Sequence, residues 1–271
     1  VAASRVFEII EKPFNQEFTN SNTIFKKLLV GPISFKNVSF SYKKDEIVLK
    51  NINFEIKPNQ TLAIIGPTGS GKTTIINLLM KWYAMDEGDI YINKKKLKDI
   101  SIQSLRMSIG VVLQNTFFLS DTLMNNIKFF NQISDANVYD AVAEIGLTEF
   151  IDKFPNKYNY QIGEKGHGLS EGEKQLVSFL RTYLINPSYL ILDEATSSMD
   201  PLTERLIQKA IKNITNNRTS IIIAHRLSTI QHADQIIVLE KGELIESGSH
   251  DELIELNKKY ANYYYQQFIK S

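Results

Sequence analysis

Gly66-Pro67-Thr68-Gly69-Ser70-Gly71-Lys72-Thr73 fits the pattern G-x-x-x-x-G-K-[ST] of a phosphate-binding loop. Residues 61–65 before it, TLAII, predict a short buried strand, and residues 74–80 after it, TIINLLM, predict a buried helix. In that setting successive backbone N–H groups and the helix N-terminus attract an anion. The sequence therefore predicts a nucleotide triphosphate site, in which Lys72 reaches the β- and γ-phosphates and the Thr73 hydroxyl holds Mg²⁺.

The composition limits the classes of protein to consider. The 271 residues carry 31 Lys and Arg against 30 Asp and Glu, and a net charge of +1 gives no support for a broad nucleic-acid or membrane surface. No apolar run approaches the roughly 18 residues needed to span a bilayer. The absence of cysteine excludes disulfides and thiolate chemistry. Because the chain begins at Val1 without a signal-peptide pattern, we expect it to be a piece of a longer protein.

The order of the predicted elements indicates an α/β protein. Residues 33–42, 48–56 and 89–93 read as strands, whereas residues 117–160 space their apolar side chains as helices do. From Tyr189 onward strands and helices alternate, as in a doubly wound parallel sheet. A last hairpin is expected to turn at Lys241-Gly242, before a terminal helix that Ser249 and Glu252 open with a capping box.

Four apolar runs end in polar or glycine residues. In parallel sheets, ligands bind outside the carboxyl ends of the strands, so neighbouring strands would bring these residues to one phosphate. They are Gly66 after residues 64–65, Gln114 after 111–113, Asp193-Glu194 after 190–192, and His225 after 221–224.

Asp193 and Glu194 are the candidate groups for chemistry. Asp193 would hold Mg²⁺ through its water shell, and Glu194 would polarise the attacking water as general base. Two carboxylates at a strand end are also compatible with a solvated loop. His225 could bond the γ-phosphate or the water, although a lone histidine or glutamine after a strand, such as His225 or Gln114, is more often structural.

Gly168-Leu169-Ser170-Glu171-Gly172 allows two interpretations. It fits G-x-S-x-G, the nucleophile elbow of serine hydrolases, with Asp200 and His225 following in triad order. The elbow needs a buried strand before its serine, however, and residues 163–167 are polar. The favoured interpretation is a helix that Ser170 caps, with Glu173 completing a capping box; such a terminus can also bind an anion.

Asp200-Pro201 similarly indicates a helix start, with an N-cap followed by proline. The predicted buried face of that helix comprises Leu202, Leu206, Ile207, Ala210, Ile211 and Ile214. Tyr42, beside a charged turn, could stack on a nucleobase or pack into the core with Phe40.

Over nearly its whole length the sequence resembles the nucleotide-binding domain of ABC transporters. The resemblance rests on residues 66–73 as the Walker A motif, Gln114 as the Q-loop, residues 190–194 as the Walker B motif, residues 197–200 as the D-loop and His225 as the switch histidine. Residues 169–173 occupy the place of the signature LSGGQ, and Tyr42 that of the adenine-stacking aromatic residue. Residues 115–123, Asn126-Ile127 and residues 163–166 are similar to the exporter branch.

The resemblance implies a P-loop NTPase core with a mostly parallel sheet, an N-terminal antiparallel β-subdomain and an inserted helical subdomain at about residues 115–186. Residues 1–30 would be a linker helix and linker from a membrane domain, and residues 31–271 the ATPase domain. The implied catalytic residues are Glu194, His225 and Gln114, and the implied Mg²⁺ ligands are Thr73, Gln114 and Asp193. The implied nucleotide contacts are Tyr42, Gly66, Pro67, Thr68, Gly69, Ser70, Gly71, Lys72, Thr73, Thr74, Ser170, Gly172 and Asp200.

The implied partners are a second nucleotide-binding domain, closing head to tail over ATP, and the membrane domain of the same transporter. The complex would power export from the cytoplasmic face of the plasma membrane, with no nucleic acid involved. A soluble ABC ATPase of repair or translation, and a nucleotide sensor with weak turnover, are the alternatives.

The signature departs from its family pattern at Glu171 and Glu173. Two added carboxylates near a γ-phosphate of the opposite subunit should oppose closure, unless Lys165 and Lys174 offset them. We therefore expect a weakened signature half, compatible with either a homodimer or a heterodimer, and expect Glu173→Gln to raise hydrolysis or ATP-driven dimerisation.

Overall fold

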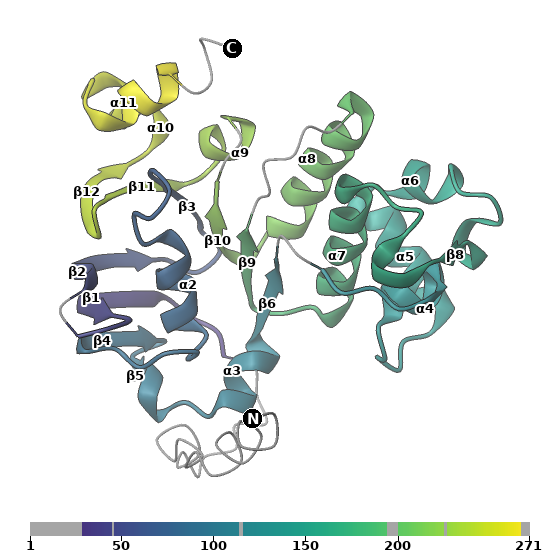
Figure 1. Ribbon diagram of the computed structural model, residues 1–271, viewed down its shortest axis with the longest axis horizontal. Coiled ribbons are helices and arrows are strands. Elements are labelled where there is room, and N and C mark those ends of the chain that lie inside the picture. The colour runs from purple at the N-terminus through teal and green to yellow at the C-terminus, as the bar shows by residue number, and fades with distance from the viewer. Residues whose placement is uncertain (1–28, 45, 114–115, 194–199, 225–226, 267–271) are drawn as a thin grey trace, which may run out of the picture.

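The protein is described here by a computed structural model, in which residues 29–44, 46–113, 116–193, 200–224 and 227–266 are placed (Figure 1). Residues 1–28 of the expected linker helix and linker lie outside these ranges. Two sheets stack on one side of the molecule and a group of helices lies on the other.

The first sheet is antiparallel, with strand order β2-β1-β4-β5. Its strands are β1 (Ile33–Ser41), β2 (Ile47–Ile56), β4 (Glu87–Ile92) and the short β5 (Lys95–Lys96). Alternate residues of β2 are buried toward its end, where Phe54 stacks on Phe35 of β1 with ring centroids 4.4 Å apart. The three predicted strands are confirmed, with ends that differ by one or two residues.

The second sheet has the order β12-β11-β3-β10-β9-β6, and every neighbouring pair is parallel except β11 with β12. Its strands are β3 (Thr61–Ile65), β6 (Ile109–Val112), β9 (Tyr189–Asp193), β10 (Thr219–Ile223), β11 (Gln235–Glu240) and β12 (Glu243–Gly248). The central strands are apolar along nearly their whole length because helices or the other sheet cover both faces.

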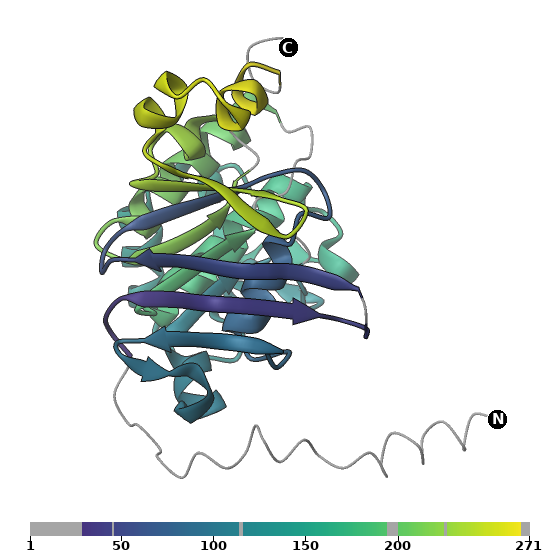
Figure 2. The same ribbon diagram turned by 90° about the vertical axis from the view of Figure 1, so that its left-hand side faces the viewer.

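Two hydrophobic cores lie on the two faces of this sheet. Leu62 and Ile64 of β3 enter the core that holds α2 (Lys72–Leu79), α3 (Ile102–Ser108) and the antiparallel sheet. Ala63 and Ile65 enter the other core, which holds α7 (Glu171–Ile185) and α8 (Pro201–Thr215). The helix after the phosphate loop is therefore fixed between two sheets (Figure 2).

The segment between β6 and β9 is mostly helical, as expected for residues 117–160. It contains α4 (Leu123–Lys128), α5 (Asp135–Ile145), α6 (Thr148–Asp152) and α7, with the two-stranded ribbon of β7 (Asp121–Thr122) and β8 (Gln161–Ile162). The segment also contains two short 3₁₀ turns, η3 (Lys157–Asn159) and η4 (Glu164–Gly166). A further 3₁₀ turn, η2 (Leu97–Asp99), lies earlier in the chain, between β5 and α3. The buried residues of α5 are those that its spacing predicts, Val138, Ala141, Val142 and Ile145.

The last part of the described chain contains α9 (Leu227–Gln231), α10 (His250–Glu255) and α11 (Lys259–Tyr264). The predicted hairpin turn at residues 241–242 joins β11 to β12, and Ser249 and Glu252 form the predicted capping box of α10.

The prediction that Leu202 belongs to the buried face of α8 is wrong. Leu202 is 53% exposed, whereas the later members of the apolar stripe, beginning with Leu206, are buried. Leu202 lies in the first turn of the helix, and the spacing alone does not reveal that the core begins one turn later.

Candidate functional site

The strands that end in the candidate polar residues are neighbours in the sheet. β3, β10, β9 and β6 follow one another, and Ile64, Ile223 and Asp193 lie in register across three of them. The fourth continues the edge, because Val112 of β6 pairs with Leu192 of β9. This confirms the expected convergence of the strand ends, although Gln114, Glu194 and His225 themselves lie outside the described residues.

The phosphate loop connects β3 to α2 at this edge. Lys72, in the first turn of α2, donates from Nζ to the Gly66 carbonyl at 2.8 Å and to the Pro67 carbonyl at 3.0 Å. Burial lowers the pKa of Lys72, and the Asp193 carboxylate opposes that shift. The ammonium group is thus held over the loop, partly desolvated, at the end of β9.

The loop itself has the features of an anion site. A Cβ at Gly66, where φ is +149°, would lie 2.1 Å from the Leu239 carbonyl oxygen, so a side chain cannot fit there. At Gly69, by contrast, an added Cβ would meet open space. The Ser70 hydroxyl is buried with no hydrogen-bond partner among the described residues. The loop is therefore packed closely against the Leu239 carbonyl at Gly66, has open space at Gly69 and carries a hydroxyl without a partner among the described residues. These features fit a triphosphate site.

Two of the three predicted magnesium ligands, Thr73 and Asp193, lie at the same edge, and the third, Gln114, is outside the described residues. Thr73 is exposed in the first turn of α2, and Asp193, partly buried, ends β9. Within the described ranges no three His, Cys, Asp or Glu side chains gather as a complete metal site would require. Mg²⁺ usually takes one or two protein oxygens and completes its shell with water and phosphate. A hydroxyl and a carboxylate are the kinds of oxygen that it binds, so Thr73 and Asp193 stay predicted ligands.

Tyr42 follows β1 and leaves the core, unlike its neighbour Phe40. Tyr42 is 43% exposed and Phe40 is 3% exposed. The Tyr42 hydroxyl lies 3.2 Å from the Thr74 hydroxyl and accepts from Asn77 Nδ2 at 2.9 Å, which anchors the ring to α2. The ring also packs edge-on against Phe40, with centroids 4.8 Å apart, so the expected contact with Phe40 is present at the rim of the core. Because Tyr42 is partly exposed near the phosphate loop, stacking on a nucleobase stays a prediction.

The start of α7 is a capped helix and not a nucleophile elbow. Ser170 accepts from the Glu173 N–H, and the Glu173 carboxylate accepts from the Ser170 N–H at 2.7 Å. The residues before it form η4 and a loop, with no strand between Ile162 and Ser170. The hydroxyl is therefore part of a cap, and the serine hydrolase interpretation has no structural basis.

The carboxylates that replace signature residues are both paired with lysines. Glu171 pairs with Lys174 at 2.8 Å, as expected, whereas Glu173 pairs with Lys153 of the chain after α6 and not with Lys165. The charge of the helix start is therefore more fully compensated than the sequence suggests.

Asp200 is the N-cap of α8, as predicted, and Gly172 is buried in the first turn of α7. The Asp200 carboxylate accepts from the Thr203 N–H at 2.9 Å, and the hydrogen bonds from Thr203 lower its pKa. Its role toward a ligand stays a prediction.

Comparisons with known proteins agree with this geometry. Residues 49–197 match the family model described as ABC transporter. The chain is 42% identical over 269 residues to the uncharacterized ABC transporter ATP-binding protein YfiC of Bacillus subtilis, covering 99% of this chain and 44% of that protein. It is 41% identical over 265 residues to the probable multidrug resistance ABC transporter ATP-binding/permease protein YheH of the same organism, covering 97% and 39%.

Among solved structures, a bacterial Atm1-family ABC exporter with ATP bound superposes with a TM-score of 0.85 at 35% identity, covering 98% of this chain and 46% of that one. The chain belongs to the ABC transporter family. It is an ATP-binding domain of exporter type, and this family hydrolyses ATP to power transport. The chain spans less than half the length of these relatives, and the described residues contain no helix that is long and apolar enough to cross a bilayer.

A buried arginine of this ABC domain was not singled out by its sequence. Arg181 of α7 donates to the Asn126 carbonyl and to the Phe117 carbonyl, both at 2.6 Å, and lies over the rings of Phe118 and Phe129 at 4.7 and 4.3 Å. Burial lowers its pKa to about 10, so it stays charged near neutrality. Arg181 ties the segment after Gln114 to the helix that Ser170 caps, a link between residues more than 50 positions apart.

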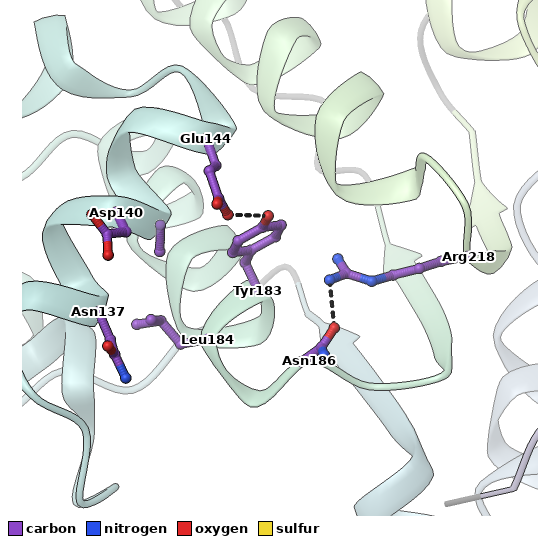
Figure 3. A pocket seen from close by; sticks show the side chains of 8 residues that line it. Asn137, Asp140, Glu144, Tyr183, Leu184, Asn186 and Arg218 are labelled. Carbon is purple, nitrogen blue, oxygen red and sulfur yellow. Dashed lines mark hydrogen bonds between the residues drawn. The ribbon is translucent and has the colours of Figure 1, made fainter.

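A cavity of about 290 Å³ lies at the opposite edge of the sheet, between α5, the end of α7 and the turn before β10 (Figure 3). Within it Tyr183 donates to Glu144 at 2.6 Å, and Arg218 donates to Asn186 at 2.8 Å while lying over the Tyr183 ring. These contacts hold the helical segment against the sheet and lie away from the phosphate loop.

Proposed function

We propose that this chain is the motor domain of an ABC exporter, which binds MgATP at the loop of residues 66–73 and hydrolyses it. The observation that supports this most directly is the adjacency of β3, β10, β9 and β6. The phosphate loop follows β3, Asp193 ends β9, and the residues proposed for the chemistry, Gln114, Glu194 and His225, come soon after β6, β9 and β10 in the sequence. Residues 1–30 would lead from a membrane domain, residues 31–271 form the ATPase domain, and residues 115–186 its helical subdomain.

The proposed roles follow the geometry. The N–H groups of the phosphate loop and Lys72 hold the phosphates, and Tyr42 packs against the base. Thr73, Gln114 and Asp193 hold Mg²⁺, which would neutralise charge on the β- and γ-phosphates. Glu194 accepts the proton of the attacking water, and His225 with Gln114 orients that water and the γ-phosphate. Ser170, Gly172 and Asp200 would contact ATP held by a second domain.

The proposed assembly is two such domains closing head to tail over ATP and joined to membrane domains at the cytoplasmic face of the plasma membrane. The printed names of the relatives support it, since they include an ATP-binding/permease protein and an ABC exporter. The paired carboxylates Glu171 and Glu173 leave both a homodimer and a heterodimer open at this point.

Phosphate release with and without Glu194→Gln tests the function. We expect Glu194→Gln to keep MgATP binding within about threefold of wild type but to slow phosphate release about 100-fold or more, because a general base contributes roughly that much. Glu149→Gln, at an exposed glutamate of α6, is the control and should behave as wild type. Full turnover in Glu194→Gln would remove Glu194 as the base, and wild-type binding without turnover would identify a nucleotide sensor instead.

A further inference from the structure

The hairpin of β11 and β12 turns in two residues with unusual backbone angles. Lys241 has φ +50° and Gly242 has φ +80°, the combination of a type I′ turn, which matches the twist of the flanking strands. This turn contacts the phosphate loop although it lies some 170 residues further along the chain.

Both backbone polar groups of Gly242 bind other parts of the molecule. Its N–H donates to the Ser70 carbonyl at 3.2 Å, and its carbonyl accepts from the Lys50 N–H at 2.8 Å. Next to this bond Lys50 Nζ pairs with Glu243 at 3.2 Å. The turn therefore bridges the phosphate loop and β2, the strand beside which the hairpin runs in Figure 2.

The strand before the turn supports the other end of the same loop. β11 pairs in parallel with β3, so that Val238 lies opposite Ile65, the last residue before the loop. One residue further, the Leu239 carbonyl comes so near to Gly66 that a Cβ there would be 2.1 Å away. The hairpin thus contacts the loop at its first residue, Gly66, and at its fifth, Ser70.

The bond to Ser70 sets the direction of an N–H group. In a planar trans peptide the C=O and N–H point to opposite sides, and no cis peptide occurs in the described chain. Because the Ser70 carbonyl points at Gly242, the N–H of Gly71 in the same peptide unit must point away from the hairpin. It is an amide of the kind on which the proposed function relies for phosphate binding.

We propose that Gly242 is a positioning residue for nucleotide binding, which fixes the Ser70–Gly71 peptide so that the Gly71 N–H is available to a phosphate. This inference rests on the proposed function and adds a residue outside all the sequence motifs. The role requires glycine for two reasons: φ is +80°, and a Cβ would lie 2.2 Å from the Val48 carbonyl oxygen.

Titration of MgATP into Gly242→Ala and Gly248→Ala tests the proposal. Gly248 ends the same strand β12, has no positive φ, and an added Cβ would meet the end of a side chain, Glu252 Oε2, at 3.0 Å, and no backbone atom as close. We expect Gly242→Ala to weaken MgATP binding and raise KM about tenfold, because a strained left-handed alanine moves the turn and with it the Ser70 carbonyl. We expect kcat to change less than about twofold. Gly248→Ala should stay within about twofold of wild type.

Gly242→Asn separates strain in φ from the close approach, because Asn tolerates a left-handed conformation but still carries a Cβ. We expect weakened binding there too. A folded Gly242→Ala or Gly242→Asn domain with wild-type affinity would overturn the proposal, as would a loss in kcat without a change in KM. If wild type itself bound no MgATP, the proposed function would fail instead.

Residue-resolved hydrogen exchange on the wild-type chain tests the same link without a variant. MgATP should increase the protection of the Gly242 amide, because holding Gly71 also holds the Ser70 carbonyl to which Gly242 donates, while the Gly248 amide should be unchanged. Equal protection of Gly242 with and without MgATP would contradict the proposal.

Discussion

Glu173 has two partners at the start of α7, the Ser170 N–H and the Lys153 ammonium. The first makes it part of a helix cap and the second compensates its charge. Glu173 and Lys153 together present a dipole to a nearby anion. A dipole repels an anion less than an unpaired carboxylate does. The expected weakening of the signature half is therefore smaller than the sequence alone implies.

A charge series tests this. Glu173→Gln keeps the capping box, since glutamine serves at that position, and should raise ATP-driven dimerisation or hydrolysis about twofold, from one charge at about 8 Å in water-like screening. Lys153→Met should act in the opposite direction, because it leaves the carboxylate uncompensated. Light scattering with ATP and the phosphate-release rate measure both. If neither variant departs from wild type, charge at the helix start does not control closure.

Asp200 gives a prediction about pH. Because hydrogen bonds from Thr203 lower the pKa of this carboxyl in the folded state, its contribution to stability is present above the ordinary aspartate pKa near 3.8 and is lost as the pH falls through the lowered value. Asp200→Asn keeps an N-cap acceptor without the charge. Thermal unfolding between pH 7 and pH 3 should therefore show a weaker acid destabilisation in Asp200→Asn than in wild type, and identical pH profiles would contradict the assigned cap.

At the scale of elements, local patterns predicted what depends on local contacts. The capping boxes at Ser170 and Ser249 and the two-residue turn before β12 involve residues close in sequence, so the residues themselves specify them. The partner of Glu173 is 20 residues away, and Arg181 reaches a carbonyl 64 residues away. Such contacts arise from the packing of α7 against the segment after β6. The spacing of apolar residues within one helix does not predict that packing.

Helix α8 shows the same limit and offers a matched pair of substitutions. Leu202 and Leu206 are one turn apart on one stripe, but Leu206 is 5% exposed and Leu202 is 53% exposed. Leu206→Ala should lower the free energy of unfolding by about 2–5 kcal/mol through lost burial and a cavity, whereas Leu202→Ala should change it by less than about 0.5 kcal/mol. Equal losses in chemical denaturation would show that α8 packs in another register.

For the whole molecule, the sequence indicates which strands end in useful residues but not that those strands are neighbours. The order β3-β10-β9-β6 arises because crossover connections place strands from distant parts of the chain side by side. The same topology sets the β11–β12 hairpin behind the phosphate loop, where Gly242 and Leu239 touch it. The family resemblance predicted the architecture. The contacts of Gly242 and Leu239 with the phosphate loop became visible only in the packing of the structure.

The central claim is that the phosphate loop of residues 66–73, with Lys72, binds a magnesium-bound triphosphate. Lys72 has a natural control in Lys81, whose pKa burial also lowers and whose ammonium donates to two backbone carbonyls, those of Lys98 and Ile100. The two positions are thus similar in environment and differ in their place relative to the loop.

Isothermal titration of MgATP into wild type, Lys72→Met and Lys81→Met tests the claim most directly. We predict saturable binding to wild type and to Lys81→Met with equal affinity, and affinity about 10- to 100-fold lower for Lys72→Met, since hydrogen bonds from a charged group contribute about 1.5–3 kcal/mol. Wild type that binds no MgATP, or Lys72→Met that binds it as tightly as wild type, would contradict the account.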